Sequence, residues 1–149
     1  MARYLRLIRP YLVLLVIVTA GRWILSFKHV PYETGTDKMS IVMLTLFASI
    51  YYGAFCRRWQ RFLLVQALAM GATLAFFGQL AILLSTLASY LMGMDTYFNN
   101  PRALNVAVAI PLAEALGRRV VGMLTNMVLN GIMGMLGWAL GALLPSDPQ

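Results

Sequence analysis

An uncharged run extends from Phe62 to Met94, and over its 33 residues it contains no Asp, Glu, Lys, Arg or His. As an α-helix with a rise of about 1.5 Å per residue, this run would be on the order of 50 Å long. The hydrocarbon core of a bilayer needs only about 20 residues, or roughly 30 Å. The run is therefore long enough to cross a membrane, and its ends must tilt, kink or project into the headgroups.

The composition of the whole chain leads to the same class of protein. Apolar residues make up 60% and charged residues 11% of the 149 residues, whereas soluble domains average about 45–50% and about 25%. A small soluble domain leaves much of its surface exposed, so it could not hide this much apolar surface from water. We therefore expect an all-α integral membrane protein that forms a single membrane domain over residues 1–149.

Apolar stretches separated by short polar ones predict a four-transmembrane-helix antiparallel bundle. The expected spans are about 11–27, 40–56, 62–93 and 119–144, with a basic interfacial leader at 1–10, an outer loop at 28–39 and an outer segment at 95–118. Between the second and third spans lies only the sequence CRRWQR, residues 56–61. Because this connection is so short, these two spans must be antiparallel neighbours.

A short amphipathic helical ramp is expected before the last span. Pro111 suits the first turn of a helix, and the residue before a proline is biased away from helix. Glu114 lies in the first turn, where the helix dipole favours an acid, and it precedes Arg118 by four residues in the favourable order for an ion pair. In an alternative arrangement residues 103–117 cross the membrane, but Pro111 and Glu114 make that crossing costly.

Lys and Arg residues beside the spans favour a cytoplasmic N-terminus. Six basic residues then lie inside and five lie outside. The inner set is Arg3, Arg6, Arg9, Arg57, Arg58 and Arg61, and the outer set is Lys28, Lys38, Arg102, Arg118 and Arg119. The inner set is concentrated in two short segments, whereas the outer set is spread out and accompanied by acids. We therefore expect a bacterial plasma (inner) membrane protein with both termini in the cytoplasm.

The net charge of +7 indicates what the basic clusters contact. In a soluble protein this charge would suggest nucleic acid, but here the basic residues flank apolar runs. The expected partner is therefore a lipid bilayer with anionic headgroups, and no nucleic acid. Arg57, Arg58, Trp59 and Arg61 are expected to act as interfacial anchors.

Small and amide side chains in the last span predict a helix-packing face. The residues of this face are Asn126, Asn130, Gly131, Gly134, Gly137 and Gly141. Glycines let another helix backbone approach closely, and an amide in hydrocarbon needs a hydrogen-bond partner. The face could form a homo-oligomer seam or dock on a larger membrane complex. The alternative, internal packing against the first three spans, is favoured because a four-helix bundle needs such a surface.

Polar residues near the outer side form a candidate polar site, although none of them makes a recognisable catalytic set. They are Arg22, His29, Glu33, Asp37, Asp95 and Glu114. Arg22 is the one charge inside an otherwise apolar run, so it could bind an anion or pair with one of the acids. It lies near the outer end of its span, however, and snorkelling to the interface is the favoured alternative. The outer loop could equally be an ordinary turn followed by a helix cap at Ser40.

The rest of the sequence offers no chemistry. A single cysteine, Cys56, excludes an internal disulfide and is expected to be a packing residue. A single histidine, His29, excludes bis-histidine haem ligation within the chain. Gln66 and Gln79 lie at similar angles on the third span, where interhelical hydrogen bonding is favoured over a polar pathway. We expect no catalytic residue, no metal site and no cofactor.

Two functions fit these observations. The first is a non-enzymatic small integral membrane protein that self-associates or serves as an accessory subunit of a membrane assembly. The second is a small dimeric membrane transporter for an anionic or neutral substrate. Small multidrug transporters also have four spans, but they depend on a carboxylate in the first span, where this chain has Arg22. Proton-coupled export of cations is therefore disfavoured.

Overall fold

The structure of the protein, a computed structural model, describes residues 2–144, without the side chains of residues 2–4, 36 and 37. Over this part of the chain every regular element is a helix. The elements are α1 (Ala2–Leu7), α2 (Arg9–Phe27), α3 (Tyr32–Lys38), α4 (Ile41–Gln60), α5 (Leu64–Leu91), the 3-10 helix η1 (Pro101–Leu104) and α6 (Leu112–Leu140). The all-helical prediction is therefore confirmed.

Three helices, α2, α5 and α6, are long and apolar enough to cross a membrane. Large apolar side chains point outward along each of them, for example Val16, Val65 and Val128, which are 68%, 74% and 67% exposed. A soluble monomer rarely exposes so much contiguous apolar surface. Helix α4 is not among the three, because Arg57 and Arg58 occupy its last turn and polar groups are spaced along it. Three of the four predicted spans are therefore found.

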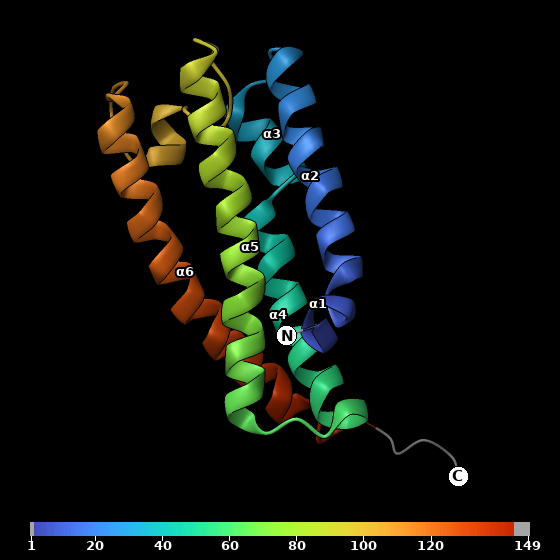
Figure 1. Ribbon diagram of the computed structural model, residues 1–149. Helices are drawn as coiled ribbons and strands as arrows, with labels where there is room; N and C mark the ends of the chain where they lie inside the picture. Colours follow the sequence, from blue (N-terminus) through green and yellow to red (C-terminus); the bar gives the residue numbers. More distant parts are fainter. Residues whose placement is uncertain (1, 145–149) are drawn as a thin grey trace.

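The four long helices lie side by side and alternate in direction (Figure 1). α2 and α5 run toward one end of the molecule, and α4 and α6 return toward the other. α4, α5 and α6 make the most extensive contacts, and α2 packs against α4 and α5. Tyr11 joins α2 to both of these helices, because its hydroxyl lies 3.0 Å from Thr45 Oγ1 and donates to the Leu74 carbonyl at 2.9 Å.

The glycine face of α6 packs inside the molecule. A Cβ atom on Gly137 would lie 2.0 Å from the Ile50 carbonyl oxygen of α4, and one on Gly134 would lie 2.5 Å from the Ala67 carbonyl oxygen of α5. Gly71 of α5 faces Asn130 in the same way. Helix backbones this close gain dispersion contacts that larger side chains would prevent. The glycine face therefore packs within the bundle, which is the alternative that the sequence favoured. Its glycines are not available to form a homo-oligomer seam.

Asn130 sits at the centre of this packing and is 1% exposed. Its Oδ1 lies 3.0 Å from the Ser49 hydroxyl of α4, and its Nδ2 donates to the Asn126 carbonyl at 2.9 Å. The amide that would be costly in hydrocarbon is thus satisfied within the bundle.

The connection between α4 and α5 is shorter than predicted. α4 continues to Gln60, so most of CRRWQR is helical, and Arg61 makes the turn with a left-handed φ of 53°. α5 begins at Leu64 instead of Phe62. Gln66 caps this helix by accepting from the Leu63 N–H at 2.8 Å. It therefore serves neither an interhelical bond nor a polar pathway.

Two of the predicted interfacial anchors, Arg57 and Trp59, have different surroundings. The guanidinium of Arg57 lies 3.9 Å from the centre of the Trp138 ring and donates to the Trp138 carbonyl at 3.1 Å. The Trp138 indole in turn donates to the Phe62 carbonyl at 2.7 Å. Arg57 therefore joins the ends of α4 and α6, whereas Trp59 is 47% exposed, as an anchor in the headgroups would be.

On the outer side, one expectation needs correction, and two are confirmed: the start of the last helix at Pro111 and the cap at Ser40. The predicted outer loop at 28–39 contains the helix α3. The predicted ramp is the first part of α6, which begins at Leu112, directly after Pro111, and continues unbroken to Leu140. Residues 103–110 form no crossing helix. Ser40 caps α4 as expected, since its hydroxyl accepts from the Met43 N–H at 3.3 Å.

Candidate functional site

An outer cap, which we define as α3 together with residues 94–105, closes one end of the bundle (Figure 1). Tyr97 holds its two parts together and is 4% exposed. Its ring packs edge-on against Tyr32 of α3, with ring centres 5.6 Å apart, and its hydroxyl donates to the Val30 carbonyl just before α3 at 2.7 Å. Its backbone N–H donates to the Ser26 hydroxyl of α2 at 3.0 Å. An exposed ion pair between Arg102 and Glu33 joins the two parts at the surface. The outer segments therefore form a packed structure.

Hydroxyl groups near the C-terminal end of α5 form hydrogen bonds with the cap. Thr86 donates to the Phe98 carbonyl at 3.1 Å, and the hydroxyls of Ser89 and Thr96 lie 2.7 Å apart. Thr86 and Ser89 are buried polar residues of a helix that is mostly apolar. Their hydrogen-bond partners come from the cap, so they can remain buried at low cost.

Arg119 fastens α6 to the cap, a role that the sequence analysis did not assign. It donates to Thr86 Oγ1 at 3.1 Å, to the Ala103 carbonyl at 3.0 Å and to the Phe98 carbonyl at 2.7 Å. The adjacent Arg118 points to the surface and pairs with Glu114 at 2.9 Å, as the spacing predicted. Neighbouring residues on a helix point in different directions. The spacing in the sequence places Arg118 beside Glu114 on the surface of the helix. This pair already indicates that the next residue, Arg119, points in a different direction.

Arg22 is buried beneath the cap and is 8% exposed. It donates to the Met39 carbonyl at 3.0 Å, and its guanidinium lies 5.6 and 5.4 Å from the ring centres of Tyr97 and Phe98. Among the described side chains it forms no ion pair. It therefore neither snorkels to the interface nor pairs with a described acid.

The five residues of the predicted polar site whose side chains are described do not converge. His29 is exposed and turns the chain after α2 with a φ of 51°. Asp95 is exposed, while Glu33 and Glu114 each pair with a different arginine. The side chain of Asp37 lies outside the described part.

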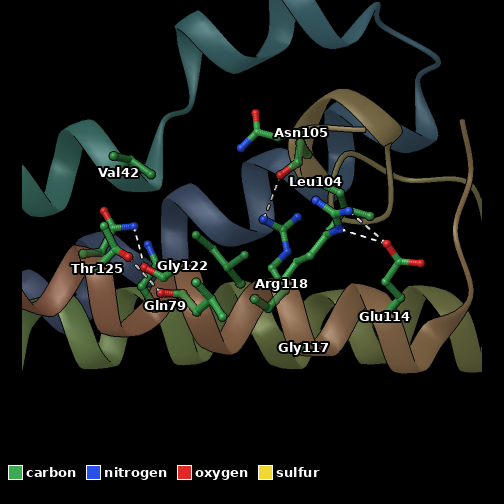
Figure 2. A pocket seen from close by; sticks show the side chains of 14 residues that line it. Val42, Gln79, Leu104, Asn105, Glu114, Gly117, Arg118, Gly122 and Thr125 are labelled. Carbon is green, nitrogen blue, oxygen red and sulfur yellow. Dashed lines mark hydrogen bonds and ion pairs between the residues drawn. The ribbon is translucent and has the colours of Figure 1, made fainter. Parts of the chain in front are cut away.

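A cavity of about 820 Å³ with a partly polar lining lies between α4, α5, α6 and the cap. Figure 2 shows Val42 of α4 facing Gly122 and Thr125 of α6 across it. Its polar lining includes Gln79, Asn126, Glu114, Arg118 and Arg119, and its apolar lining includes Ile82 and Val121. The outer half of α6 carries no glycine-mediated contact, since a Cβ on Gly117 or Gly122 would meet nothing within 4 Å. The cavity therefore opens where close packing of α6 ends.

Gln79 is the most informative residue of this cavity. It is 8% exposed, and no hydrogen bond joins its amide to another described residue. Asn126 uses its Nδ2 on the Gly122 carbonyl at 2.8 Å, which leaves its Oδ1 available. Three N–H groups of Arg119 are used, and a guanidinium has five. The cavity thus presents donors and acceptors that the described chain does not use.

In the described part of the chain, no three His, Cys, Asp or Glu side chains form a group that could hold a metal ion. Cys56 is 0% exposed and belongs to the core, as expected of a packing residue. No family model, curated protein or solved structure matches the chain.

Proposed function

We propose that this chain is a non-enzymatic integral membrane protein that binds an anionic or neutral substrate in the cavity between α4, α5 and α6, as a small transporter does. The observation that carries the proposal is that Gln79, whose amide has no hydrogen-bond partner among the described residues, lines a cavity of about 820 Å³ together with Arg119. A substrate with hydrogen-bonding groups would satisfy the amide.

The lining favours an amphiphilic substrate. Its ionisable side chains are Glu114, Arg118 and Arg119, so positive charge exceeds negative charge by one. Glu114 is already paired with Arg118, which leaves Arg119 to face the cavity with two unused N–H groups. Val42, Ile82 and Val121 supply an apolar wall. A molecule with one polar or negatively charged end and an apolar remainder fits this arrangement.

Within this proposal α4 is the fourth span and the bundle crosses the membrane four times. α4 has 20 residues, enough for a bilayer core of about 30 Å, and it is enclosed by α2, α5 and α6. Its buried polar groups therefore face protein instead of lipid. We retain the cytoplasmic N- and C-termini and the bacterial inner membrane expected from the sequence, because the arginine-rich end of α4 and the end of α6 lie together.

Native mass spectrometry of protein purified in a mild detergent tests substrate binding. The wild type should carry a bound mass that survives gentle activation, and the double variant Gln79→Leu, Asn126→Leu should lose it. Thr73→Val is the matched control, because Thr73 lies on α5 outside this cavity and bonds only to its own helix. The same bound mass in the double variant, or none in the wild type, would contradict the proposal.

A role in assembly is the second candidate. The glycine face is used internally, so a partner would have to contact another surface. The exposed apolar side of α6 offers one: Val121, Leu124 and Val128 are 64%, 58% and 67% exposed. Cross-linking in native membranes, followed by mass spectrometry of the purified complex, distinguishes a homodimer, a larger complex and a monomer. A protein that stays monomeric and uncross-linked would remove the accessory-subunit and dimer hypotheses together.

A further inference from the structure

Arg22 is a buried cation that the described side chains do not neutralise. It is 8% exposed and lies inside the span formed by α2. Its neighbours are the Met39 carbonyl, the rings of Tyr97 and Phe98, and the side chain of Tyr32. All of these groups are uncharged at neutral pH. They orient the guanidinium, but they do not cancel its charge.

Two buried polar atoms on this side of α2 lack hydrogen-bond partners. They are Arg22 Nε and Thr19 Oγ1, and they are the only such side-chain atoms in the described part of the chain. Residues three apart on a helix are neighbours on its surface, with Cβ atoms roughly 5–6 Å apart. An unused N–H and an unused hydroxyl on neighbouring turns indicate a site for an acceptor that the chain does not supply.

The surroundings of Arg22 add positive potential. The carbonyl that it contacts belongs to Met39, directly before Ser40, the N-cap of the 20-residue helix α4. A helix N-terminus carries roughly half a positive charge. On the other side, Arg119 donates to the carbonyl of Phe98, the residue whose ring Arg22 covers, and the two arginines repel each other. A cation that is desolvated in this way costs several kcal/mol unless an anion compensates it.

We propose that a small monovalent anion of halide size binds beneath the outer cap, between Arg22 and the N-terminus of α4. The anion accepts from Arg22 Nε and from the Thr19 hydroxyl, and it faces the positive end of α4. The site is separate from the substrate cavity, since neither Arg22 nor Thr19 lines that cavity. The proposal of this anion site therefore does not depend on the proposed transport function.

Chloride is the probe for this site. Thermal unfolding of the detergent-purified protein should be compared in sodium chloride and in sodium gluconate at equal ionic strength. We expect the midpoint to rise with chloride concentration, and to keep rising with the logarithm of that concentration once it exceeds Kd, because a ligand that binds only the folded state stabilises it by RT ln(1 + [L]/Kd). Equal midpoints in the two salts at every concentration would overturn the proposal.

Two variants locate the effect. Arg22→Met should abolish the difference between the salts, whereas Arg118→Met should keep it, because Arg118 is exposed and pairs with Glu114. Asp37→Asn tests whether a carboxylate of the chain fills the site instead. Chloride dependence that appears only in Asp37→Asn would overturn the proposal, and dependence equal to that of the wild type supports it.

A crystallographic measurement covers the case in which Arg22→Met does not fold. Crystals of the wild-type protein grown in bromide should show an anomalous peak beside Arg22 Nε. Density for a water molecule there, with no anomalous signal, would overturn the proposal.

Discussion

Replacing Gly137 by alanine should destabilise the protein, because the added methyl group has no room. Its carbon would lie 2.0 Å from the Ile50 carbonyl oxygen and 2.7 Å from the carbonyl carbon, whereas ordinary contacts begin near 3.4 Å. Both atoms belong to the backbone of α4, so a side-chain rotation cannot relieve the clash. The helices α4 and α6 must separate locally by roughly 1 Å, which forfeits a quarter to a half of each dispersion contact in that region.

The magnitude follows from two opposing terms. Overpacking a tight interior costs about 1–3 kcal/mol, and contact with backbone places Gly137→Ala at the upper end. Replacing glycine by alanine within a helix returns about 1 kcal/mol. The expected net loss is therefore about 2 kcal/mol, and at about 2–4 °C per kcal/mol for a chain of this size the unfolding midpoint falls by about 4–8 °C.

Gly122→Ala provides the matched control on the same helix. Its added carbon would meet nothing within 4 Å, so this variant should be about 0.4–1 kcal/mol more stable than the wild type. Thermal unfolding in detergent, with size-exclusion chromatography and light scattering on the same samples, measures stability and oligomeric state together. The reasoning is refuted if Gly137→Ala is as stable as Gly122→Ala. It is also refuted if Gly137→Ala only dissociates an oligomer while the monomer keeps its stability.

Three further substitutions test separate contacts. Tyr11→Phe removes the hydroxyl that joins α2 to α4 and α5 through contacts of 3.0 and 2.9 Å; thermal unfolding should show a loss of about 1–2 kcal/mol, whereas Tyr51→Phe, at a residue 60% exposed, should show none. Arg57→Lys keeps the charge but loses the planar group 3.9 Å from the centre of an indole ring of α6, so hydrogen exchange at the C-terminal end of α6 should accelerate; an unchanged rate would show that the contact does not hold the helix ends together. Arg119→Lys cannot reproduce three simultaneous donations to Thr86 and the cap, so exchange within the outer cap should rise, while Arg118→Lys should leave it unchanged.

Much of the fold follows from local sequence. Apolar length predicts α2, α5 and α6, because a helix in lipid must satisfy its own backbone and its length is set by the bilayer. Ser40 and the pair Glu114–Arg118 were predicted from spacing alone, and the structure confirms both contacts. Each of these features is determined within one continuous stretch of sequence and needs no contact between distant segments.

The features that sequence reasoning missed depend on contacts between distant segments. α3 contains Gly35 and polar residues that read as a turn, yet it packs against Tyr97, more than sixty residues later. Arg22 was expected to snorkel because it is near the end of its span, but the outer cap covers it. The cavity around Gln79 likewise arises where α6 leaves the close packing set by its glycines. Hydropathy and spacing contain no information about such covering segments.

The topology of the chain tests the central claim, that four helices including α4 cross the membrane. Reporter fusions should be placed at both termini and after Gly93, whose added Cβ would meet nothing within 4 Å. The account predicts that both terminal reporters are cytoplasmic and that the reporter after Gly93 lies on the opposite side. Termini on opposite sides of the membrane would contradict it, because an odd number of helices would then cross.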